Sequence, residues 1–136
     1  MSLSNSMETK ALKWLFKLEA DESNSSLRPT AWYVALCTSD PTDSALGTEV
    51  STSGTAYARQ AVTFTVSGNN ASNSSAIEFP EATAAYGTVQ AVMIMPASAG
   101  GSASDMIAHA QLTTDKAINS GDIFRIPAGD LDINID

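Results

Sequence analysis

The chain has 136 residues, 43% of them hydrophobic and 16% charged, which excludes a disordered chain and a charged coiled coil and is typical of one globular domain. Fifteen acidic residues against seven basic ones give a formal net charge of -8, which argues against binding to a nucleic acid duplex or an anionic membrane. With one cysteine and one histidine, the composition favours a binding or structural module over an enzyme.

The first residues lack the basic region and apolar core of a secretory signal, and no run of about 18 apolar residues predicts a transmembrane helix, so synthesis in a cytoplasm is expected. Residues 5–18 are predicted to form an amphipathic helix capped by Asn5, with Glu8 at capping-box spacing. Its apolar side holds Met7, Ala11, Trp14, Leu15 and Leu18, and Lys10, Lys13 and Lys17 share the opposite side. Two interpretations stay open: the helix packs on its own domain, or it docks on a neighbouring subunit.

Residues 19–30 are polar and contain Pro29, and they are predicted to be a linker to a β-domain over residues 31–136. Residues 31–38 form an apolar run that predicts a central strand buried on both faces. The long loop predicted over 39–56 contains the turn signals Asp40-Pro41 and Gly47, and loops of this length often make intermolecular contacts.

Further strands are predicted over residues 57–66, 76–79, 87–95, 106–112, 122–126 and 130–136. The intervening residues are predicted as loops, and for the segment EATAAYG (81–87) a weak helix is the alternative. In 57–66 the side chains of Val62, Phe64 and Val66 are expected to share one face. In 130–136 the inward-pointing residues are expected to be Leu131, Ile133 and Ile135. The fold class predicted is all-β: a single β-sandwich or jelly-roll-like domain of about seven strands, with one N-terminal helix.

The acidic residues give no convincing metal site. Alternate carboxylates on the 130–136 strand lie about 7 Å apart, too far for one chelate, and a solvated strand face is the better interpretation. Asp40 and Asp43 resemble half of a calcium loop without its register, so turn capping is favoured for them.

The sequence also gives no convincing pair of catalytic residues. Cys37 and His109 could in principle form a thiol–imidazole pair, but an apolar run surrounds Cys37, and His109 is expected to meet a backbone or surface partner. Tyr57, Arg59 and Gln60 could hold a sugar or a base, although Arg59 is expected to pair with a nearby carboxylate. No catalytic, cofactor-binding or metal-ligating residue is therefore assigned, and no cofactor is expected.

Several strings together resemble a family of small virion proteins of tailed bacteriophages, usually labelled tail fibre or minor virion structural proteins. The strings are WYVALCTSDPTD, GTEV, YARQAVTF, FPEATAAYGTV and the closing GDIFRIPAGDLDINID. They are strand cores and turns rather than catalytic signatures, and the resemblance spans nearly the whole chain.

The resemblance implies a non-enzymatic structural protein of the virion, made in the bacterial cytoplasm, as an exterior accessory subunit of the tail or a decoration of the capsid. The expected partners are other virion proteins and further copies of the chain, with a trimer favoured; nucleic acid and membrane are not expected as partners. The alternative function is a carbohydrate-binding β-sandwich that attaches to a host-surface glycan. The candidate partner-binding residues lie in the N-terminal helix and the 39–56 loop: Met7, Ala11, Trp14, Leu15, Leu18, Asp40, Asp43 and Glu49.

Overall fold

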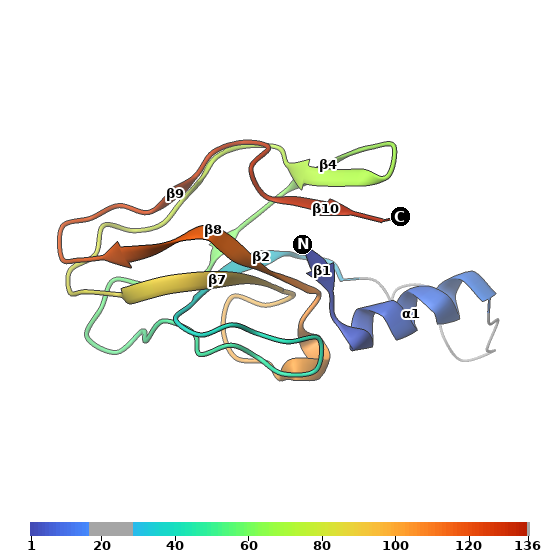
Figure 1. The fold of residues 1–136 in the computed structure, drawn as a ribbon, viewed down its shortest axis with the longest axis horizontal. Helices are drawn as coiled ribbons and strands as arrows, with labels where there is room; N and C mark the ends of the chain where they lie inside the picture. The colour runs from blue at the N-terminus through green and yellow to red at the C-terminus, as the bar shows by residue number, and fades with distance from the viewer. Residues whose placement is uncertain (17–28, 136) are drawn as a thin grey trace.

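The computed structural model describes residues 1–16 and 29–135, which form antiparallel sheets in two layers with one N-terminal helix (Figure 1). The predicted all-β, sandwich-like class is confirmed. The predicted linker falls mostly on residues 17–28, which lie outside the described residues.

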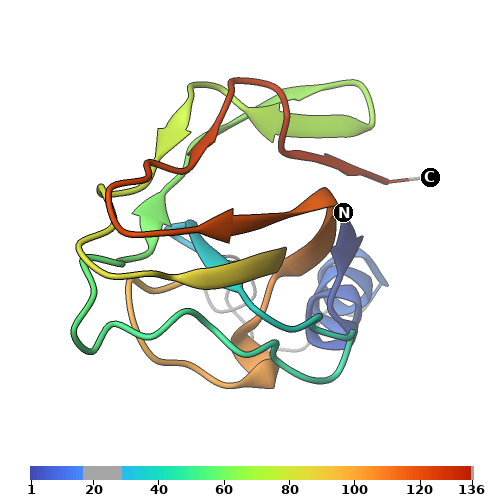
Figure 2. The same cartoon turned by 60° about the vertical axis from the view of Figure 1, so that its left-hand side comes forward.

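The larger sheet has five strands in the order β1-β8-β7-β2-β3. Its strands are β1 (Ser2–Leu3), β2 (Tyr33–Cys37), β3 (Gln60–Ala61), β7 (Gly87–Met95) and β8 (Ala108–Ile118). The opposing layer holds a three-stranded sheet, β10-β5-β4, and a two-stranded sheet, β6-β9 (Figure 2). These strands are β4 (Phe64–Ser67), β5 (Asn70–Asn73), β6 (Ile77–Glu78), β9 (Arg125–Ile126) and β10 (Asp132–Asn134).

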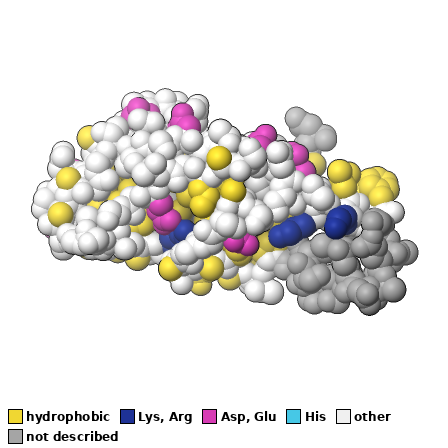
Figure 3. All heavy atoms as spheres, turned by 90° about the horizontal axis from the view of Figure 1, so that it is seen from below, with side chains coloured by type: hydrophobic (Ala, Val, Ile, Leu, Met, Phe, Trp, Pro, Cys, Tyr) yellow, Lys and Arg dark blue, Asp and Glu magenta, His cyan; other side chains and the backbone are white. Residues whose placement is uncertain are grey.

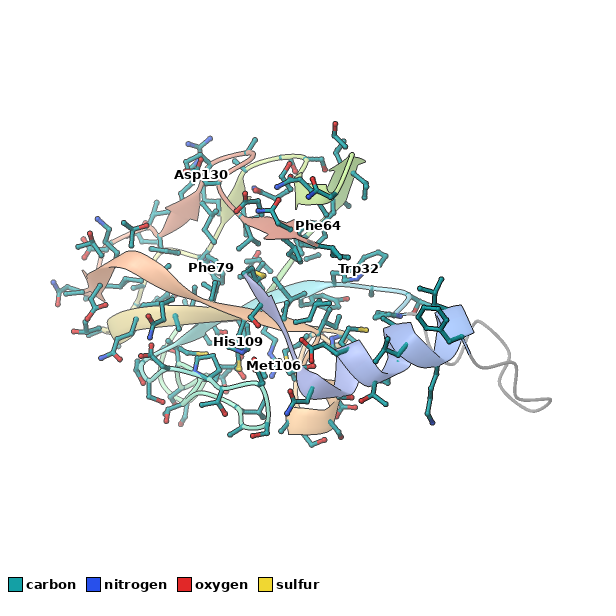
Figure 4. The ribbon with its side chains drawn as sticks, turned by 45° about the vertical axis from the view of Figure 1, so that its right-hand side comes forward. Trp32, Phe64, Phe79, Met106, His109 and Asp130 are labelled. Carbon is teal, nitrogen blue, oxygen red and sulfur yellow. The ribbon has the colours of Figure 1, made fainter. Side chains whose placement is uncertain are left out.

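The larger sheet is buried on both faces, because alternate side chains of its central strands enter two separate cores. On β2, Val34 and Leu36 point between the layers, and Ala35 and Cys37 point to the other side. That other side is covered by the segments that join β2 to β3 and β7 to β8, with Met106 in the second core (Figures 1 and 4). These four of the five β2 residues are fully buried, as expected of a central strand.

An aromatic cluster forms the centre of the core between the layers. The ring of Phe79 stacks on Tyr57 with centroids 6.2 Å apart and meets Phe124 at 5.8 Å. Tyr86 meets Tyr57 edge to face at 5.7 Å. Figure 4 shows Phe64 and Phe79 between the two layers. These contacts fix the spacing of the layers, because aromatic pairs contribute beyond the apolar area that they bury.

Strand boundaries differ from the sequence prediction in several places, and residues 1–16 and 29–135 form ten strands rather than about seven. The predicted strand 57–66 is divided into β3 and β4, and Val66 is 72% exposed rather than inward. Residues 70–73, predicted as loop, form β5, and β8 continues to Ile118 through residues predicted as loop. The inward pattern predicted for 130–136 holds for Leu131 but not for Ile135, which is 65% exposed.

The helix α1 (Asn5–Phe16) begins where the sequence predicts, but its cap is Ser4 rather than Asn5. The Ser4 hydroxyl accepts a hydrogen bond from the Met7 N–H at 3.2 Å and donates to the Met106 carbonyl. Ser4 is fully buried, so the cap also ties the start of the helix to the larger sheet's second core. No helix among the described residues is long and apolar enough to cross a membrane.

Candidate interaction surface

The first turn of α1 is fastened to the body through residues far away in the sequence. The Ser4 N–H donates to the Ile107 carbonyl at 3.0 Å, and the Asn5 N–H donates to the Asp43 carbonyl at 3.0 Å. The Ser6 hydroxyl donates to the Ser104 carbonyl at 2.7 Å. The two segments predicted to bind partners, the helix and the 39–56 loop, therefore meet at the base of α1.

Beyond that first turn, α1 projects from the end of the sandwich (Figure 1). The predicted apolar side of the helix is not buried as a unit: Met7 packs against the core, whereas Leu15 is 61% exposed. Leu12 and Phe16 are 59% and 77% exposed and were not among the predicted partner-binding residues. Leu12, Leu15 and Phe16 follow an i, i+3, i+4 pattern, and we call them the helix stripe.

Of the remaining predicted helix residues, Ala11 is exposed, the side chain of Trp14 is not described, and Leu18 lies outside the described residues. Seen from below, the loop-covered face of the body carries scattered acidic side chains (Figure 3). Basic and then apolar side chains lie towards the end from which the helix projects. The exposed apolar stripe on the projecting helix is therefore the candidate interaction surface.

The acidic loop residues predicted to contact partners have partners within the chain. Asp43 Oδ1 lies 2.9 Å from His109 Nε2 and accepts a hydrogen bond from the Ser2 hydroxyl at 3.3 Å. The Gln111 amide donates to Asp40 Oδ2 at 2.6 Å. These carboxylates join the loop to β1 and β8, whereas the sequence favoured capping of their own turn. The predicted surface partner of His109 is thus Asp43.

Glu49 takes part in the most buried charge pair of the described residues. The return of the 39–56 segment runs beside β2, with Glu49 bridged to Cys37 and the Val50 N–H bonded to the Leu36 carbonyl at 3.0 Å. Glu49 Oε1 and Oε2 accept hydrogen bonds from Nε and Nη2 of Arg59 at 2.8 and 2.7 Å. The predicted pairing of Arg59 with a carboxylate is confirmed.

Two more groups complete this network. The Tyr57 hydroxyl donates to Glu49 Oε1 at 2.8 Å and accepts the Leu36 N–H at 3.0 Å. Arg59 Nη1 donates to the Ala97 carbonyl at 2.9 Å, which fixes the segment after β7. Burial acts to raise the pKa of Glu49, but the hydrogen bonds from Arg59 and Tyr57 outweigh it and hold that pKa below its ordinary value. The network is a structural clasp between two loops.

Cys37 and His109 cannot act together. They lie on β2 and β8, which flank β7, so two strand spacings of about 5 Å each separate their backbones. Burial raises the pKa of the Cys37 thiol to about 12, so the reactive thiolate is suppressed. Among residues 1–16 and 29–135, no group of three or more His, Cys, Asp or Glu side chains is placed to hold a metal ion.

The family model described as podophage GP4 fiber I protein gp80 matches residues 2–134, which covers both layers, the base of α1 and the clasp. No curated protein matches the chain.

Proposed function

We propose that the chain is a non-enzymatic accessory subunit of the phage tail. The premise is that it belongs to the podophage GP4 fiber I protein gp80 family and is therefore a virion structural protein of the tail fibre type. In this proposal each subunit is joined to a second copy of the chain by the helix stripe. The single observation that carries the proposal is the exposure of Leu12, Leu15 and Phe16 on a helix whose first turn is hydrogen-bonded to the body.

An isolated helix of twelve residues is marginal in water, so α1 needs a surface that covers its apolar side chains. Burial of the stripe would contribute on the order of 1–2 kcal/mol for each of the three side chains. Because the apolar residues lie towards the tip, a neighbouring molecule is the natural source of that surface.

Charge favours a second copy as the neighbour. Residues 1–16 contain two basic residues and one acidic residue, whereas residues 29–136 contain eleven acidic and three basic residues. A helix with a positive balance is therefore attracted to the acidic body of another copy, and acidic bodies without such a contact repel each other. Head-to-tail contacts form a closed ring when the rotation between neighbours divides a full turn, and otherwise an open filament; a ring of three copies is the arrangement that we propose.

The triple variant Leu12→Ser, Leu15→Ser, Phe16→Ser tests this proposal by light scattering coupled to size-exclusion chromatography. The native chain is expected to elute with the mass of three copies, and the triple variant as a monomer with an unchanged circular dichroism spectrum. The control variant Val66→Ser, Ile123→Ser removes side chains that are 72% and 54% exposed and lie away from α1, and it should assemble normally. A native monomer at every concentration, or a trimeric triple variant, would refute the role of the stripe.

A second experiment tests where in the virion the protein is located. Labelled antibody viewed on purified virions by electron microscopy should mark the tail, and stoichiometric copies should be found by mass spectrometry of the particles. Label on the capsid shell would favour the decoration alternative, which no specific observation now supports, since the matched family is described as a fibre protein.

A further inference from the structure

The side of the sandwich opposite to the loop clasp carries an open groove of about 320 Å³ between the two layers. One wall comes from β8, with Leu112 and Lys116, and the other comes from the β9 region, with Phe124, Arg125 and Asp130. The ring of Phe124 is held by Phe79 in the core, so this wall is rigid. The volume is at the lower end of the range for small-molecule sites and suits one or two sugar rings.

A large irregularity of β8 shapes this groove. Lys116 pairs with Val89 and Gln111 pairs with Ala91, so residues 112–115 of β8 face the single residue Gln90 of β7. The β8 backbone bulges out of the regular ladder here, and residues 113–117 are exposed. Bulges of this kind are found where a strand is re-aimed beside a binding site.

Two of the basic side chains of the acidic body lie in the groove. Residues 29–136 contain three basic residues, Arg59, Lys116 and Arg125, and Arg59 is occupied by Glu49. Lys116 and Arg125 are both exposed and both line the groove. No carboxylate among residues 1–16 and 29–135 lies within 4.0 Å of either side chain.

We propose that this groove binds a saccharide that bears carboxylate groups, such as a chain of uronic acids. Lys116 and Arg125 would receive the carboxylate, and charge-assisted hydrogen bonds of this kind are the strong ones. The apolar C–H face of a sugar ring lies against Leu112 and Phe124, and the Asp130 carboxylate accepts from sugar hydroxyls.

An acidic peptide is the other ligand with this charge, and the shape of β8 disfavours it. A peptide that binds beside a strand adds to the row of backbone donors and acceptors at the sheet edge. The bulge at 112–115 interrupts that row over the length of the groove. A ring with hydroxyls and a carboxylate needs no such row.

Titration calorimetry of the full chain with trigalacturonic acid tests the proposal. Maltotriose serves as the neutral probe, and a short poly-glutamate peptide as the acidic peptide. The native chain is expected to bind trigalacturonic acid at least ten times more tightly than either. The variant Lys116→Gln, Arg125→Gln should lose at least tenfold in affinity, and the control Lys10→Gln, Lys13→Gln should lose less than twofold.

Several results would overturn the proposal: no binding of trigalacturonic acid, equal binding of maltotriose, binding that survives in Lys116→Gln, Arg125→Gln, or an equal loss in the control variant. Equal or tighter binding of poly-glutamate would replace the saccharide by an acidic peptide as the ligand. Because both substituted side chains are exposed, the variants should fold, and thermal unfolding followed by circular dichroism checks that they do.

Discussion

Loss of Arg59 should be the most damaging single change to a charged residue of the body, and we consider Arg59→Met in detail. The Arg59 side chain is 4% exposed and makes three hydrogen bonds, two to Glu49 and one to the Ala97 carbonyl. Removal of one partner of a buried ion pair costs about 3–5 kcal/mol, because the other charge stays buried without compensation. The Glu49 side chain is 27% exposed and can be partly hydrated, so we expect the lower end of that range, about 3 kcal/mol.

The assay is equilibrium urea unfolding, with thermal unfolding as a second measurement. For a chain of this length, a loss of about 3 kcal/mol corresponds to a fall in Tm of roughly 10–15 °C. The exposed Arg125→Met is a matched control of the same chemical change and should alter the free energy of unfolding by less than about 0.5 kcal/mol.

A second variant tests the cause. If the unpaired Glu49 charge is responsible, Glu49→Gln in the Arg59→Met background should recover about 1–2 kcal/mol, because the remaining partner is then neutral. The reasoning is refuted if Arg59→Met unfolds within 0.5 kcal/mol of the native chain. An absence of recovery in the double variant would assign the cost to lost packing instead.

Three further predictions concern stability. Gly47→Ala should cost about 1–3 kcal/mol in urea unfolding, because its Cβ would lie 2.5 Å from the Ser39 carbonyl oxygen and 3.1 Å from Cys37 Cβ; a neutral effect would contradict this close approach. Ser4→Ala should cost about 1–2 kcal/mol in thermal unfolding, since it removes both the helix cap and the bond to Met106, and native stability would argue against the cap. Because the folded pKa of Glu49 is below its ordinary value of 4.5, its contribution is complete above that pH and is lost as the pH falls below it. Glu49→Gln should therefore flatten the decline in stability below pH 4.5, and equal slopes for the two proteins would be inconsistent with the lowered pKa.

Elements with a strong local pattern were predictable from the sequence. β7 occupies the predicted residues 87–95, because an apolar run lies between Gly87 and Pro96. β5 was missed because its Asn- and Ser-rich residues lack any strand pattern, and it is held by pairing with β4 and β10. A signal was present nevertheless: Gly68, with φ of 60°, begins a two-residue turn of the kind that joins hairpin strands.

The interaction surface was predictable only in part. Periodicity alone locates a helix but does not say which side faces the body, so Leu12 and Phe16 were left out of the predicted surface. The internal partner of Asp43, His109, lies 66 residues away, and only the fold brings the two together. For Arg59 the sequence indicated a carboxylate partner without identifying Glu49, ten residues away.

The two ends of the described chain share one end of the sandwich: Met1, Leu3 and Ile135 line the same pocket, beside the start of α1 (Figures 1 and 2). A purification tag or fluorescent protein fused at either terminus would thus emerge next to the projecting helix and obstruct the contact between copies that we propose for it. The exposed turn at Asn119–Gly121, at the distal end of β8, is a better place to insert a label. Terminal fusions would then be poor reagents for testing the proposed assembly, whereas labels in the distal turn would leave that end of the sandwich open.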